Sequence, residues 1–167
     1  NTALEPMAPK KIFEKPFIGT SVYEDITILF SRDGNYSVVM SIENKAVQYA
    51  SDPRDYEEYH QLLGQCIKIL GPQFILQKTD IIARKAYCTP TAVSSRDYLQ
   101  EKYFQHFEGR SYRALTSLLT VTRQYAKGRF FTYDPKEIKD FIQKIHKVRD
   151  AFHNQKLSTS VLDEQAL

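Results

Sequence analysis

The chain has 167 residues, of which 42% are hydrophobic and 26% charged, and its formal net charge is +3. This is the length and composition of one globular domain with its own core, which excludes a disordered or fibrous chain. The mild positive charge does not by itself indicate a nucleic-acid-binding protein. The two cysteines favour a reducing compartment over a disulfide framework. No apolar run approaches the ~18 residues of a membrane span.

The first part of the chain predicts an extended segment and then a hairpin. Residues 1–15 carry two prolines among mixed polar residues and are expected to form an extended, weakly ordered arm. Residues 26–30 and 36–42 alternate along their length, and Asp33-Gly34 between them is a turn signal. The second strand is apolar on one side, so the hairpin is expected to bury that face and leave the other near water.

A helix and a long strand are predicted next. Asp52 is suited to cap the helix, Pro53 to its first position, and Gly71-Pro72 to its end. The extended segment 74–87 is longer than most small sheets, so a bulge or bend is expected near Asp80. The apolar face expected on the helix consists of Tyr56, Tyr59, Leu63, Cys66, Ile67 and Leu70.

The remaining pattern predicts two more helices and a strand. One helix begins at Ser94 or Ser95 and ends at Gly109, a strand covers residues 114–122, and the last helix is capped by Asp134 with Pro135 first. The apolar stripe expected on the last helix consists of Ile138, Phe141, Ile142, Ile145, Val148 and Phe152.

The order β-β-α-β-α-β-α predicts an α+β domain over residues 16–157, with a mixed or largely antiparallel four-stranded sheet and helices layered on it. Residues 158–167 resemble a capped helix start that stops after about two turns. They are expected to begin a further, truncated helix, and the chain is expected to be a fragment of a longer protein.

Few residues predict chemistry. The chain has no phosphate-binding loop, nucleophile elbow or zinc-type cysteine pair, so no catalytic residue, cofactor or metal is expected. His146, Asp150 and His153 share one side of the last predicted helix, where a polar helix flank is favoured over a metal site. Cys66 is expected in the core, and neither Cys66 nor Cys88 is a good nucleophile candidate. The least favoured hypothesis is a small hydrolase or nuclease, for which Asp80 and Asp97 are conceivable carboxylates.

The segment 109–133 combines basic and aromatic residues and has no acidic one. This combination suits a single-stranded nucleic acid path, and equally an acidic protein surface or lipid headgroups. A solvated strand with its flanking loop remains an alternative of similar weight. The candidate partner-binding residues are Arg110, Arg113, Arg123, Lys127, Arg129, Tyr112 and Tyr125.

Three segments resemble the amino-terminal part of the TraG family of conjugation ATPases found in Bacteroides-type conjugative transposons. They are ITILFSRDGNYSVVM at residues 26–40, LGPQFILQKTD at 70–80 and FQHFEGR at 104–110. The order of a strand with an Asp-Gly turn, a helix and a long strand covers most of the chain. These segments carry no catalytic signature, so no catalytic residue is transferred from the family.

The resemblance implies a two-part parent protein, similar to the large ATPase of type IV secretion. Its amino-terminal domain would dock onto inner-membrane components and sister subunits, and a carboxy-terminal motor, absent here, would use ATP and magnesium. The leading hypothesis is therefore a non-catalytic docking domain that supports DNA transfer. It would lie in the cytoplasm, peripheral to the inner membrane. Whether this domain itself contacts DNA is left open by the sequence. The alternative is a single-stranded nucleic-acid-binding module that uses residues 109–133.

Overall fold

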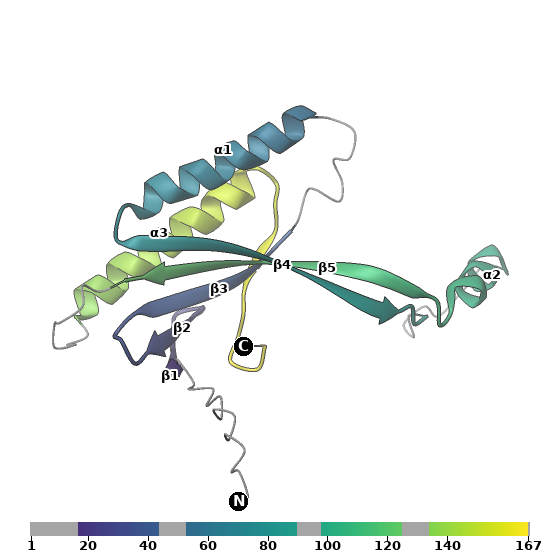
Figure 1. Ribbon diagram of the computed structural model, residues 1–167, viewed down its shortest axis with the longest axis horizontal. Coiled ribbons are helices and arrows are strands. Elements are labelled where there is room, and N and C mark those ends of the chain that lie inside the picture. The colour runs from purple at the N-terminus through teal and green to yellow at the C-terminus, as the bar shows by residue number, and fades with distance from the viewer. Residues whose placement is uncertain (1–16, 44–52, 90–97, 125–133, 167) are drawn as a thin grey trace, which may run out of the picture.

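The fold is α+β, as the sequence predicts, but its sheet is larger than expected. The computed structural model describes residues 17–43, 53–89, 98–124 and 134–166 (Figure 1). Their sheet has six antiparallel strands, where four were predicted. The elements are β1 (Phe17–Tyr23), β2 (Ile26–Ser31), β3 (Tyr36–Ile42), α1 (Pro53–Leu70), β4 (Phe74–Ala86), α2 (Tyr98–Phe107), β5 (Ser111–Arg123), α3 (Pro135–Asn154) and β6 (Thr159–Val161).

The two unpredicted strands are β1 and β6. The strand order is β1-β2-β3-β5-β4, and β6 pairs with the second half of β3. Strand β1 is exposed along most of its length, so it lacks the one-sided apolar alternation that identifies a half-buried strand. The prediction of a helix start at residues 158–167 is wrong, because Thr159–Val161 pairs with Met40–Ile42 instead. A serine- and threonine-rich segment fits an edge strand as well as a helix cap.

The core lies between one face of the sheet and the helices α1 and α3 (Figure 1). On β3 the alternation is as predicted, with Tyr36, Val38, Met40 and Ile42 buried. All six predicted positions of the α3 stripe are buried as well. On α1 the predicted apolar face is partly wrong, because Tyr56 and Ile67 are exposed. The buried residues of α1 are spaced three, four and four apart: Tyr59, Leu62, Cys66 and Leu70.

The helix ends follow the predicted signals where the structure describes them. The side chain of Asp134 accepts a hydrogen bond of 2.9 Å from the backbone N–H of Lys136, and Pro135 is the first residue of α3. Helix α1 ends at Leu70, and the predicted stop Gly71 follows it with φ +83 and donates its backbone N–H to the carbonyl of Ile67 at 3.0 Å. The predicted cap Asp52 and the predicted helix start at Ser94 or Ser95 lie outside the described residues.

Strand β4 runs without the bulge expected near Asp80. Its register with β5 is unbroken from the pair Phe74–Arg123 to the pair Ala86–Ser111, because β5 is equally long and pairs with it throughout. Strand β3 pairs with β5 only over residues 117–123. Residues 81–86 of β4 and 111–116 of β5, here called the distal ribbon, therefore extend beyond the sheet by about 20 Å. Helix α2 lies at the far end of the ribbon (Figure 1).

Candidate functional site

The distal ribbon and α2 leave large apolar side chains in solvent. No residue of α2 is buried. Leu99 on this helix is 73% exposed, and Ile82 on the ribbon is 69% exposed. An isolated pair of strands is marginally stable in water, and exposed apolar groups gathered on one projection mark a contact surface. The candidate functional site is therefore this projection rather than a cavity.

Aromatic packing holds α2 against the end of the ribbon. The ring of Tyr87 lies 6.3 Å from that of Phe107 and 6.5 Å from that of Phe104. The backbone of Tyr87 donates to the carbonyl of Arg110 and accepts from the N–H of Gly109, both at 2.9 Å. Gly109 has φ +74, a left-handed conformation that glycine adopts without strain. The tip is thus an ordered structure that can present a defined surface.

The projection is also basic. Its described residues, 81–89 and 98–116, contain five basic side chains (Arg84, Lys85, Lys102, Arg110 and Arg113) and two acidic ones (Glu101 and Glu108). Arg84 and Arg113 are directly opposite each other in the antiparallel register. Like charges in that position repel, so the ribbon bears a local excess of positive charge that an anionic partner would neutralise.

The structure divides the predicted basic-aromatic segment into two places. Arg110, Tyr112 and Arg113 lie in or beside the distal ribbon, at its far end. Arg123 lies at the other end of β5, ten residues from Arg113, or about 33 Å along a strand. Three further predicted contact residues, Lys127, Arg129 and Tyr125, lie outside the described residues.

The expectation that Arg123 is an exposed contact residue is wrong. Its side chain is 11% exposed and its Nη2 lies 3.2 Å from Oε1 of Glu137. Its guanidinium also lies 5.7 Å from the ring centroid of Phe74 and 6.0 Å from that of Tyr36. A cation in these contacts ties β5 to α3 and to the core, and has little surface left to offer a partner.

Sequence reasoning missed Arg84 and Lys85 as members of the basic surface. They precede the basic segment by more than twenty residues, and only the strand register brings them beside it: Arg84 faces Arg113, and Lys85 faces Tyr112. The long strand at residues 74–87 was predicted, so pairing it with the next strand would have supplied the missing signal.

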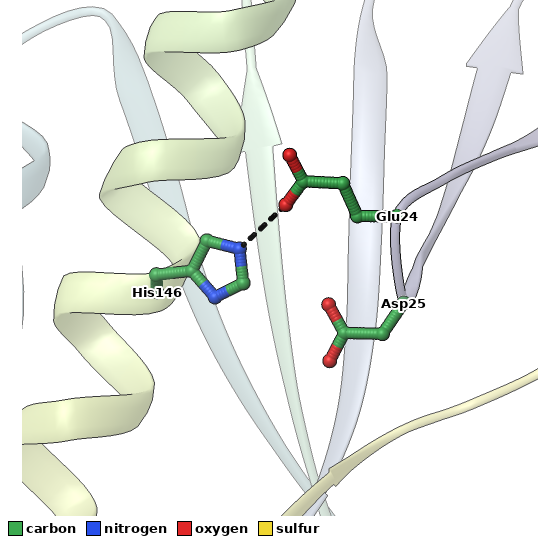
Figure 2. Close-up of side chains that lie close together, drawn as sticks. All are labelled: Glu24, Asp25 and His146. Atoms are coloured by element: carbon green, nitrogen blue, oxygen red, sulfur yellow. Dashed lines mark ion pairs between the residues drawn. The ribbon is translucent and has the colours of Figure 1, made fainter.

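A second cluster joins the β1–β2 turn to α3, and Figure 2 shows Glu24, Asp25 and His146 of this cluster. Nε2 of His146 lies 3.5 Å from Oε2 of Glu24. Nη1 of Arg149 lies 2.7 Å from Oδ2 of Asp25. The hydrogen bond from Arg149 lowers the pKa of Asp25 below its usual value. One ligand atom each from Glu24, Asp25 and His146 lies within 4.8 Å of the others, a nitrogen and oxygen set that suits Zn²⁺.

The ion pair between Arg149 and Asp25 competes with a metal for this cluster. The Asp25 carboxylate is already neutralised by Arg149, so a divalent cation would have to displace or tolerate a guanidinium. The predicted group His146, Asp150 and His153 lines one depression of the surface together with Asp25 and Arg149. In the close cluster, however, His146 meets the two acidic residues of the turn rather than Asp150 and His153.

Asp80 has a structural role where the ribbon leaves the sheet. It accepts hydrogen bonds from Nζ of Lys78 and, at 2.6 Å, from Oγ of Ser117. These two bonds lower the pKa of Asp80, with that from Lys78 the larger cause. Asp97, the second carboxylate of the hydrolase hypothesis, lies outside the described residues.

The two cysteines are expected to differ sharply in reactivity. Cys66 is fully buried, and burial raises the pKa of its thiol to about 11, so neither access nor ionisation favours attack. Cys88 is exposed. We expect a thiol-reactive disulfide reagent to titrate one thiol in the native protein and two in guanidinium chloride. A Cys88→Ser variant should show none until it unfolds; a fast-reacting thiol in that variant would contradict the burial of Cys66.

These features define a class of protein: an α+β domain whose antiparallel sheet extends into a projecting two-stranded ribbon capped by a helix. No protein-family model matches the chain, and comparison with curated proteins finds no significant match. Among the described residues, no helix combines the length and the apolar character needed to cross a membrane.

Proposed function

We propose that this chain is a non-catalytic assembly domain that docks onto partner proteins through its distal ribbon and α2. The main support for this proposal is that β4 and β5 continue beyond the sheet and expose apolar and basic side chains there, including Ile82 and Arg113. Interfaces are enriched in aromatic residues and arginine at their centres, and the projection offers both. Its tip is ordered by aromatic packing, so it can bind without first folding.

The parent that we propose is a conjugation ATPase of the TraG type, on the resemblance of residues 26–40, 70–80 and 104–110. The domain would then attach the motor to inner-membrane components and to sister subunits during DNA transfer, on the cytoplasmic side of the membrane. ATP and magnesium would bind only to the motor. The resemblance includes part of α2 and of the tip, which is where the proposed contact lies.

Reversing two charges of the ribbon tests this function. In the full-length parent protein, Arg110→Glu with Arg113→Glu should lower the frequency of DNA transfer about tenfold or more, because charge reversal at an interface replaces attraction by repulsion. The matched control is Lys139→Glu with Lys147→Glu, which makes the same change in net charge at exposed positions of α3. Normal transfer by the ribbon variant, with the protein present at its usual level, would rule out the ribbon as a docking surface.

A second candidate function, single-stranded nucleic acid binding, is favoured by one observation. Lys85 lies directly opposite Tyr112, whose ring is exposed, and a cation beside a stacking ring suits a phosphate backbone with bases. This second function predicts that the chain binds a labelled single-stranded oligonucleotide at low salt, and that its affinity falls steeply when the salt concentration is raised. We rank it second because the exposed isoleucine and leucine side chains nearby are not the aromatic platforms on which single-stranded bases usually stack.

A further inference from the structure

The core-facing side of the sheet continues onto the distal ribbon, where no described element covers it. Side chains alternate along a strand, and directly opposite residues share a face. The buried pair Met40–Leu119 therefore lies on the same face as Ser117, Leu115 and Arg113 further along β5. Burial on this face ends abruptly, since Ser117 is 2% exposed and Leu115 is 37% exposed.

Two rows of side chains make up this uncovered face. The first row is the apolar pair Ile82–Leu115, and the second is the basic pair Arg84–Arg113. Arg84 leans toward the tip, where its Nη2 donates to Oγ of Ser111 at 2.9 Å. In the body of the domain the same face is packed by amphipathic helices (Figure 1). The ribbon thus offers a short continuation of a helix-binding surface, apolar near the body and cationic near the tip.

We infer that the uncovered face (Ile82, Leu115, Arg84 and Arg113) binds an acidic amphipathic segment of a partner protein. Apolar side chains of that segment would cover Ile82 and Leu115, and its carboxylates would pair with Arg84 and Arg113. The bound carboxylates would also remove the repulsion between the two opposed arginines. This inference rests on the proposed docking function and specifies the chemistry of the partner.

The apolar row decides between a protein and a nucleic acid as the occupant. A phosphate backbone would satisfy Arg84 and Arg113 but would leave the exposed isoleucine and leucine without a matching surface. An amphipathic peptide matches both rows at once. The single-stranded nucleic acid is therefore an outcome against which the inference is tested.

The test uses the purified chain and synthetic probes. The probe is a fluorescein-labelled peptide of about 18 residues, five helical turns, with leucines on one face and glutamates on the other. A scrambled peptide of the same composition and a labelled oligothymidylate serve as comparisons, all measured by fluorescence anisotropy. We expect the amphipathic peptide to bind at least about tenfold more tightly than either comparison. Absence of binding, or tighter binding of the oligothymidylate, overturns the inference.

Charge reversal on the uncovered face gives a second, independent readout. Arg84→Glu with Arg113→Glu should weaken peptide binding about tenfold or more, while the control Lys139→Glu with Lys147→Glu should not. The single variant Arg113→Glu places an acidic side chain opposite Arg84, which should stabilise the strand pair. The amide hydrogens of residues 81–86 should therefore exchange with solvent about two- to fivefold more slowly than in the wild type. The same variant should nevertheless bind the acidic peptide less well. Unchanged peptide binding in the double variant overturns the inference.

The outcome separates this inference from the proposed function. If the peptide does not bind but the ribbon variants still lose DNA transfer in the parent protein, docking through the ribbon stands and the acidic amphipathic partner is wrong. If transfer is normal in the ribbon variants, the proposed function itself fails, whatever the peptide does.

Discussion

Replacing Phe141 by alanine is expected to lower the free energy of unfolding by about 3–5 kcal/mol, the usual cost of truncating a buried phenylalanine. Phe141 of α3 is fully buried where helix and sheet meet. Its ring centroid lies 4.9 Å from that of Tyr36 on β3, in an edge-to-face arrangement, and 5.9 Å from that of Phe74 on β4, in a stacked one. Alanine would remove both contacts and leave a cavity, at a cost that is a large share of a typical domain's stability.

Denaturant titration followed by circular dichroism measures this loss, with two controls. Phe141→Leu keeps most of the side-chain volume and should cost far less than the alanine variant. Phe107→Ala removes a phenyl ring from α2, outside the core, and should change global stability by less than about 1 kcal/mol. If the alanine variants at positions 141 and 107 were equally destabilised, the division between a stabilising body and a projecting ribbon would be wrong.

The elements that the sequence predicted well are those with one strongly buried face. The stripe of α3 and the alternation of β3 each meet one apolar layer, so their period appears directly in the residues. On α1 the stripe was misplaced because Tyr56 and Ile67 are apolar but exposed. Periodicity cannot separate an apolar residue of the core from one at the edge of a helix face.

Strand pairing was the part that periodicity could not supply. Strand β6 has three residues, and it is fixed by pairing with β3 rather than by any pattern of its own. The continuous length of β4 depends on the equal length of β5, a partner more than twenty residues away. The candidate site depends on the same pairing, because opposition of Arg84 and Arg113 is a property of the register and not of either strand alone.

Arg123→Ala is expected to lower the free energy of unfolding by about 2–4 kcal/mol, because it removes one member of a largely buried ion pair and a cation stacked on aromatic rings. Glu137, its partner, is 35% exposed and can turn partly toward water, which keeps the loss below that of a fully buried pair. Arg123→Met, which restores the apolar stem but not the charge, should recover part of the loss. Denaturant titration of the two variants measures the difference.

Reversing the charge distinguishes this residue from the basic residues of the ribbon. Arg123→Glu would set two carboxylates together beside the core, at the place where Arg123 and Glu137 now lie 3.2 Å apart. It is expected to lower the free energy of unfolding more than Arg123→Ala does. Arg113→Glu, on an exposed surface, should leave global stability within about 1 kcal/mol of the wild type. Equal stability of the two reversed variants would mean that Arg123 belongs to the contact surface after all. The expected contrast would show that the two ends of β5 differ: Arg123 stabilises the core, whereas Arg113 stays on the surface, where the proposed contact would lie.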